Sequence, residues 1–171
     1  MSMTDTEKMR VLDEAQIDQK IKRIAYQIFE NNFEEKSIFI AGVQGPGYVL
    51  GEKIKKQLEK ISKIKVGLLQ IEIDKMSPSK SDIKIDGDLS EVKNKVVLLV
   101  DDVQHTGKTF AYSLRPFLNI KVKKIEVAVL VNRAHTSFPI APTYTGYELS
   151  TTINDHIHVV LDDGKKGVYL Q

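Results

Sequence analysis

The segment from Val97 to Thr109, VLLVDDVQHTGKT, constrains the fold more than any other part of the chain. Together with Val96, its first residues form an uninterrupted apolar run, which is typical of a strand covered on both faces. Two carboxylates, Asp101 and Asp102, follow this run, and a short loop then leads into a helix that begins near Gly107. A buried strand, a polar loop and a helix in that order indicate an open parallel sheet, in which ligands lie beyond the carboxyl ends of the strands.

The loop after this strand carries the groups that a phosphate requires. The first amides of the helix lack intrahelical partners and lie at the positive end of the helix dipole. Gly107 lets the backbone approach the phosphate closely, while Thr106 and Thr109 offer hydroxyl donors and Lys108 a cation. The two preceding aspartates can accept hydrogen bonds from sugar hydroxyls or hold a hydrated Mg²⁺.

Two better-known phosphate motifs do not fit the sequence. A Walker P-loop requires glycine five residues before the Gly-Lys-Thr, and Asp102, which would repel phosphates, occupies that position. A dinucleotide fingerprint around Gly45, Gly47 and Gly51 fails because its third glycine falls one place late. A strand end with a helix cap would explain two aspartates alone, but not their combination with Thr-Gly-Lys-Thr at this spacing.

The remainder of the chain alternates between the helical and strand periods. Asp13 with Gln16 resembles a capping box. Two amphipathic helices are expected, the first with the apolar positions Ile17, Ile21, Ile24, Ile28 and Phe29, and the second with Leu50, Ile54, Leu58 and Ile61. Two strands are expected over Ser37–Ala41 and Ile64–Ile73. A helix over residues 107–118, kinked or shortened by Pro116, is expected to point these residues inward: Phe110, Leu114, Phe117 and Leu118. With a further strand over Lys124–Val131, the pattern predicts an α/β fold with a central, mostly parallel sheet flanked by helices.

We expect a single domain over residues 1–171. Residues 11–131 form the α/β core, which includes a flexible loop at residues 74–92, and residues 132–171 form a small antiparallel hood of three short strands. The expected hood strands are Thr143–Glu148, His156–Leu161 and Val168–Leu170.

Composition excludes several classes of protein. The chain has no cysteine, which rules out disulfides, thiolate metal sites and cysteine nucleophiles. Its first residues are polar, and no apolar run approaches the roughly 20 residues of a membrane helix, so we expect a cytoplasmic protein. His156 and His158 could share one face of a strand and suit a metal, but we favour half-exposed strand residues because no third ligand is evident.

The net charge of +2 is too small to indicate nucleic-acid binding, but lysines crowd one stretch. These are Lys53, Lys55, Lys56, Lys60, Lys63 and Lys65. A solvated helix face is the favoured interpretation, and a binding surface for RNA or DNA phosphates is the alternative.

The strand–loop–helix segment resembles the phosphoribosyl-pyrophosphate motif of type I phosphoribosyltransferases: four apolar residues, Asp-Asp, and then Thr-Gly-Lys/Arg-Thr. More narrowly, the chain is similar to the pyrimidine-operon attenuator proteins that double as uracil phosphoribosyltransferases. This likeness covers nearly the whole chain, including Val11–Glu14, Asn132–His135, Tyr144–Gly146 and Gly167–Tyr169.

The resemblance implies a role for each matching position. The 5-phosphate would be bound by His105, Thr106, Gly107, Lys108 and Thr109. Asp101 and Asp102 would hold the ribose, Val43, Gln44 and Gly45 would form the pyrophosphate loop, and Asn132 and Arg133 would lie near the base. Residues 74–86 would close over the site, with Lys75 as a catalytic cation beside the two aspartates.

The resemblance also implies the partners. The chain would bind phosphoribosyl pyrophosphate or a nucleoside monophosphate together with Mg²⁺, which is held through the substrate rather than by a dedicated protein site. A nitrogen of the nucleobase would attack the anomeric carbon as pyrophosphate leaves, without a covalent nucleophile on the protein. Assembly through the sheet-flanking helices would give a homodimer or larger oligomer.

Three departures from the family pattern leave two hypotheses open. The family's Lys-Thr-Arg-Gly pyrophosphate loop is replaced by Gln44–Gly47, and its Tyr-Arg-Asp-Asp by Asp74–Ser77, which retains one cation at Lys75. The Asp-Arg-Gly-His-Arg near the base is Asn132–Thr136 in this chain. The chain is either an enzyme that acts on a pyrimidine, less readily a purine, or a nucleotide-sensing regulator that binds RNA through the basic helix and has lost turnover.

Overall fold

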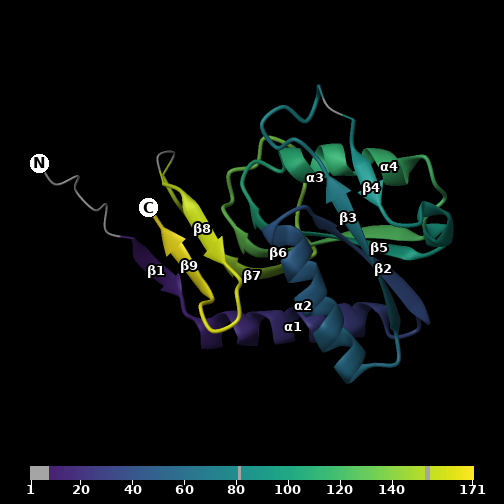
Figure 1. Cartoon of the computed structure of the whole chain (residues 1–171), viewed down its shortest axis with the longest axis horizontal. Coiled ribbons are helices and arrows are strands. Elements are labelled where there is room, and N and C mark those ends of the chain that lie inside the picture. The colour runs from purple at the N-terminus through teal and green to yellow at the C-terminus, as the bar shows by residue number, and fades with distance from the viewer. Residues whose placement is uncertain (1–7, 81, 153–154) are drawn as a thin grey trace, which may run out of the picture.

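A computed structural model describes residues 8–80, 82–152 and 155–171. Figure 1 shows the chain as a layered α/β structure with a small separate sheet at one end. The elements are β1 (Met9–Leu12), α1 (Glu14–Asn32), β2 (Ser37–Val43), α2 (Pro46–Ile61), β3 (Lys65–Glu72), β4 (Lys84–Asp86), the 3₁₀ helix η1 (Leu89–Val92), β5 (Val96–Gln104), α3 (Lys108–Ser113), α4 (Arg115–Leu118), β6 (Lys124–Asn132), β7 (Tyr144–Glu148), β8 (Ile157–Val160) and β9 (Gly167–Leu170).

The central sheet has six strands in the order β4-β3-β2-β5-β6-β7. All its pairings are parallel except that of β3 with the edge strand β4. The expected α/β fold with a mostly parallel sheet is therefore confirmed. From β2 the chain passes outward to β3 in one direction, whereas from β5 it passes to β6 in the other. The gap between the carboxyl ends of β2 and β5 is thus the topological switch point, where ligands of such sheets bind.

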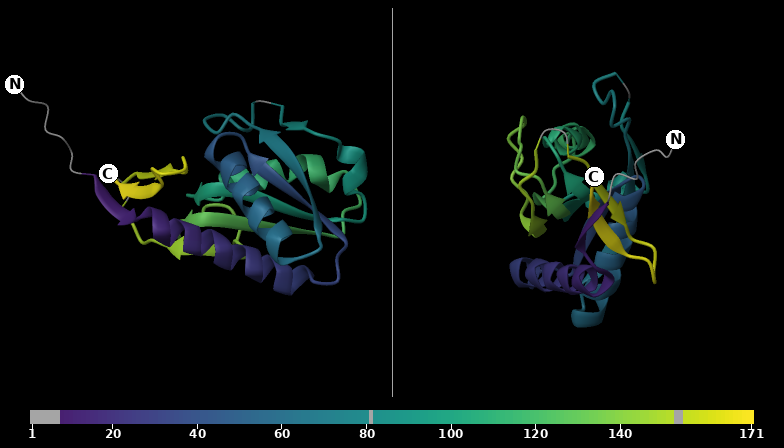
Figure 2. Two further views of the ribbon diagram at one scale, coloured as in Figure 1. Left: turned by 60° about the horizontal axis from the view of Figure 1, so that its bottom comes forward. Right: turned by 90° about the vertical axis from the view of Figure 1, so that its left-hand side faces the viewer.

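Helices cover both faces of this sheet (Figure 2). One apolar cluster joins α1 and α2 to the sheet through residues such as Ile24, Ile54 and Leu98. A second cluster, which includes Leu99, Phe110 and Phe117, fills the opposite face beneath α3 and α4. Burial of neighbouring β5 residues on both faces accounts for the apolar run at its start.

Local sequence signals explain where the helices begin and end. Asp13 caps α1: its side chain accepts a hydrogen bond from the Gln16 amide at 2.8 Å, and the Gln16 side chain accepts one from the Asp13 amide at 2.9 Å. The helix expected over residues 107–118 is divided into α3 and α4, with Pro116 in the first turn of α4, as the proline predicted. One inward position was wrong, because Leu118 ends this short helix and is 68% exposed.

The hood differs from the sequence-based expectation. It is a three-stranded antiparallel sheet in the order β1-β9-β8, so it recruits the N-terminal strand, for which no strand was predicted. Strand β7, expected in the hood, instead pairs parallel with β6 in the central sheet. The prediction was wrong there because the sequence of a five-residue strand does not indicate which sheet edge it will join.

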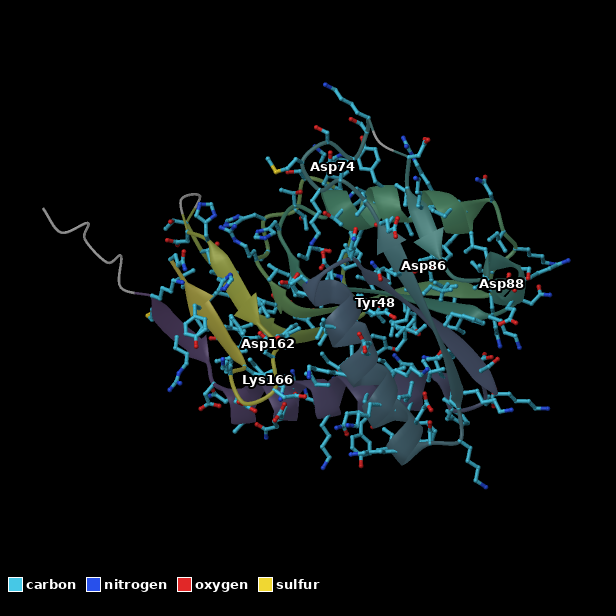
Figure 3. All side chains as sticks on the ribbon, viewed as in Figure 1. Tyr48, Asp74, Asp86, Asp88, Asp162 and Lys166 are labelled. Atoms are coloured by element: carbon cyan, nitrogen blue, oxygen red, sulfur yellow. The ribbon has the colours of Figure 1, made fainter. Side chains whose placement is uncertain are left out.

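An ion-pair cluster fastens the hood to the core. Lys166, only 7% exposed along its side chain, lies 3.0 Å from Asp18 and 3.1 Å from Asp163, while Lys53 of α2 lies 2.8 Å from Asp163. Figure 3 shows Lys166 and its neighbour Asp162 in the turn between β8 and β9, close to the two long helices. Within the described parts of the chain, no helix is long and apolar enough to cross a membrane.

Candidate functional site

A pocket of about 290 Å³ lies at the carboxyl end of β5, beside the topological switch point. Residues 101–110 form most of its wall, joined by Lys75 from the β3–β4 connection and Ile157 from the hood. Asp101 and Asp102 were expected to follow the strand, but they belong to it, because β5 continues to Gln104 in register with β6. The phosphate-type loop therefore begins at His105, directly after a rigid strand.

The loop after β5 has the conformation that close approach of an anion requires. Gly107 adopts φ 84°, a left-handed conformation that side chains rarely adopt. A Cβ atom here would also lie 3.2 Å from the Phe138 carbonyl oxygen. The first helical hydrogen bond of α3 runs from the Ala111 amide to the Gly107 carbonyl oxygen, at 2.9 Å. The amides of Thr109 and Phe110 lie before this bond and have no acceptor within the helix. Because α3 is only six residues long, these local amides rather than a large helix dipole would bind an anion.

Asp101 is buried, and each of its two carboxylate oxygens has one hydrogen-bond partner. Its side chain is 2% exposed; Oδ1 accepts the Asp102 amide at 2.9 Å, and Oδ2 lies 2.9 Å from Lys75 Nζ. Burial, followed by the negative charge of Asp102, raises the pKa of Asp101 to about 8, while Lys75 opposes this rise. Asp101 therefore lies buried in the pocket wall, and Lys75 makes its burial tolerable.

The start of α2 presses against this carboxylate. A Cβ atom on Gly47 would lie 2.7 Å from Asp101 Oδ1 and 3.0 Å from the Asp101 Cα atom, so only glycine fits. The preceding Gly45 has φ 93° and caps the helix without any side-chain hydrogen bond. The N-terminal end of this 16-residue helix is thus aimed at the same end of the sheet as the phosphate-type loop.

Arg133 organises the side of the site that faces the hood. Its Nε donates to Thr151 Oγ1 at 2.7 Å, and its Nη2 donates to the Thr152 carbonyl oxygen at 3.0 Å. Its Nη1 lies 3.0 Å from His105 Nδ1. A guanidinium has only donors, so Nδ1 must accept and the proton of a neutral His105 lies on Nε2. Partial removal from water and then the Arg133 charge lower the pKa of His105, which favours this neutral form.

The structure brings most of the predicted site residues into one pocket. Its lining includes Lys75, the two aspartates, His105 and Thr106–Thr109. Arg133 reaches it through His105, whereas Asn132 is buried and hydrogen-bonds weakly to Glu148 Oε1 at 3.5 Å. The predicted pyrophosphate loop, Val43–Gly45, does not line this pocket.

Two contributors were missed by sequence reasoning. Gly47 was considered only in the rejected dinucleotide motif and in the stretch that replaces the family's pyrophosphate loop, and its contact with Asp101 depends on how α2 packs. Gln104 was overlooked although it is the polar last residue of a strand that begins with an apolar run, and it is only 2% exposed. Its polarity was the available signal in the sequence, whereas its burial is known only from the fold.

Comparison with known proteins agrees with this geometry. Residues 9–163 match the family described as the phosphoribosyl transferase domain. The chain is a phosphoribosyltransferase family member. The type I resemblance drawn from the Asp-Asp and Thr-Gly-Lys-Thr segment is therefore confirmed.

Curated relatives extend over nearly the whole chain. The "Bifunctional protein PyrR" of Macrococcus caseolyticus is 34% identical over 176 residues, covering 96% of this chain and 99% of the relative. The protein of the same name from a Thermoanaerobacter species is 32% identical and covers 93% of each chain.

Solved structures support the fold alone, because their sequences are distant. The hypoxanthine phosphoribosyltransferase of Trypanosoma cruzi superposes with a TM-score of 0.77 at 15% identity, covering 94% of both chains. A hypoxanthine-guanine phosphoribosyltransferase of Bacillus anthracis gives a TM-score of 0.70 at 21% identity, covering 84% of each.

Proposed function

We propose that this protein binds phosphoribosyl pyrophosphate or a nucleoside monophosphate with Mg²⁺ and transfers ribose 5-phosphate to a nucleobase, a pyrimidine such as uracil. The observation that carries the proposal is the pocket at the end of β5, where two carboxylates adjoin a left-handed glycine and uncapped amides. The PyrR relatives support a link with pyrimidines only through the subfamily resemblance described above.

In the proposed reaction a ring nitrogen of the base forms a bond to the anomeric carbon of the ribose. The bond from that carbon to pyrophosphate breaks, pyrophosphate departs with the electron pair, and the base nitrogen loses its proton. The chain's own contribution is positioning: residues 106–109 hold the 5-phosphate, and Asp101 and Asp102 hold the ribose hydroxyls. Ile157 of the hood lines the pocket, where the hood would help to exclude water from the reaction.

The donor set at the pocket fits Mg²⁺. Asp102, next to the buried Asp101, supplies hard oxygen ligands, and the described residues contain no cluster of three or more histidines and acids that could form a cage. Such a partial site suits an ion that keeps its waters and substrate phosphates as its other ligands. When bound, Mg²⁺ would neutralise charge on the departing pyrophosphate.

A comparison of affinity with turnover tests the proposal. We expect UMP to bind, as measured by calorimetry with Mg²⁺, and we expect UMP to form slowly from uracil and phosphoribosyl pyrophosphate. Two cation positions of the family's loop hold Gln44 and Pro46, and each lost charge contact typically reduces the rate about 10²–10³-fold. Guanine and hypoxanthine are the control bases. Absence of UMP binding would refute the site, and turnover of about 10 s⁻¹ would refute the expected weakness.

The alternative function is a nucleotide-sensing regulator that binds RNA. A groove of about 710 Å³ between α1 and α2 supports it. Lys22, Lys56 and Lys60 line this groove without a carboxylate partner among the described residues, and Tyr26, 44% exposed, offers a ring on which a base could stack. Lys53, another lysine of α2, is instead paired with Asp163.

RNA binding and oligomeric state have direct tests. If the groove binds RNA, the double variant Lys56→Gln/Lys60→Gln should weaken binding and make it less dependent on salt. Lys93→Gln, outside the groove, is the control. Equal salt dependence of RNA binding for the wild type, the double variant and Lys93→Gln would exclude the groove as the RNA-binding site. We further propose a homodimer or larger assembly, which light scattering would contradict if it gave the mass of a single chain.

A further inference from the structure

Gln104 is a buried polar residue in a largely apolar strand. It ends β5, a strand that begins with five apolar residues, and its side chain is almost completely buried. Its Nε2 atom donates to the Ile140 carbonyl oxygen at 3.0 Å, whereas its Oε1 atom is buried without a partner among the described residues. An unsatisfied buried acceptor destabilises the folded state, so stability alone does not explain a glutamine here.

The hydrogen bond of Gln104 anchors a segment that supports the phosphate-type loop. We call Ser137–Ile140 the strap. The amides of Ser137 and Phe138 both donate to the Thr106 carbonyl oxygen, at 2.9 and 3.0 Å. The strap also lies against Gly107, since a Cβ atom there would come within 3.2 Å of the strap's backbone. The strap therefore contacts both Thr106 and Gly107.

Beyond Thr106 and Gln104, the strap is held by apolar contacts: Ile140 packs against the second apolar cluster, and the Phe138 ring meets the Tyr112 ring edge-on, with centroids 6.2 Å apart. Ser137 and Pro139 are exposed, and Phe138 and Ile140 are only partly buried. Inside the strap, the Ile140 amide donates to the Phe138 oxygen at 2.7 Å, which tightens the segment but does not attach it to the core. A buried side chain on a rigid strand is thus its firmest polar attachment beyond Thr106 itself.

We infer that Gln104 is a positioning residue: it fixes the strap, and the strap holds the loop at residues 106–109 in the conformation that receives the substrate's phosphate. This inference rests on the proposed function. The loop of this chain has its left-handed glycine followed by a helix of only six residues. Such a short helix holds its first turn weakly, so an external brace matters more than it would beside a long helix.

The test is Gln104→Met, which keeps the length of the side chain and removes both polar atoms. We expect Kd for UMP and for inorganic phosphate to rise about three- to tenfold, the effect of one lost hydrogen bond. The melting temperature should change little, because removal of the unsatisfied Oε1 acceptor offsets the lost hydrogen bond to the Ile140 carbonyl oxygen. The amides of Ser137 and Phe138 should exchange hydrogen faster. Gln70→Met, on the partly buried strand β3, is the matched control and should change none of these.

Each outcome decides the inference. A lower melting temperature with unchanged affinity, or failure of Gln104→Met to fold, would make Gln104 a structural residue and overturn it. Unchanged affinity and exchange would overturn it while leaving the proposed function intact. If the wild-type protein binds neither UMP nor inorganic phosphate, the proposed function fails, and the inference fails with it.

Discussion

Replacing Asp101 with asparagine should change how the stability of the protein depends on pH. The substitution keeps the shape and the acceptor for the Asp102 amide but removes the ionisable proton. The pKa of Asp101 is about 8 in the folded chain, against about 3.9 for an unfolded aspartate. Because the folded pKa is raised, the folded state carries one more proton between these values, and its stability falls as pH rises through that window.

The magnitude follows from the same linkage. Each pH unit inside the window changes the free energy of unfolding by about 1.4 kcal/mol. Raising pH from about 5.5 to about 7.5 should thus cost the wild type about 2–3 kcal/mol more than Asp101→Asn. The pKa of about 8 already includes the opposing effect of Lys75, which lies 2.9 Å away.

Urea denaturation followed by circular dichroism at three pH values provides the measurement. Asp86→Asn, on the exposed edge strand β4, is the matched control and should follow the wild type. Parallel pH profiles for Asp101→Asn and the wild type would refute the reasoning. They would show that Lys75 and the start of α2 keep Asp101 ionised despite its burial.

Three further substitutions test the pocket. Gly107→Ala should destabilise the fold by about 1–2 kcal/mol, because alanine disfavours a left-handed backbone, and should weaken sulfate binding; unchanged melting and binding would contradict the loop geometry. Gly47→Ala should displace Asp101, whose Oδ1 would lie 2.7 Å from the new atom, so ribose-dependent binding should fall more than sulfate binding. Lys75→Met should slow UMP formation about 10²-fold with a smaller effect on UMP affinity, and Lys80→Met is its control; equal loss of rate in both variants would argue against a catalytic cation.

The chemistry of the pocket was predictable because its main groups are contiguous in the sequence. From Asp101 to Thr109, the carboxylates, hydroxyls, glycine and lysine occur within one strand, one loop and one helix start, where spacing fixes their relative positions. The capping box at Asp13 and the division of the third helix by Pro116 are likewise local effects. Hydrophobic periodicity was sufficient for the order of the long elements, since amphipathic segments must bury one face.

Tertiary structure decided the contacts between distant segments. Lys75 reaches Asp101 across 26 residues, Gln104 meets Ile140 across 36, and the hood joins strands from both ends of the chain. No local preference encodes these pairings, because each depends on which elements pack side by side. The sequence by itself determined that an α/β chain would present a phosphate-type loop after a buried apolar run and two adjacent carboxylates. Only the packed fold determined that one carboxylate would be buried beside a lysine and that the loop would be hydrogen-bonded to the Ser137–Ile140 strap, since burial and long-range hydrogen bonds exist only after the sheet is assembled.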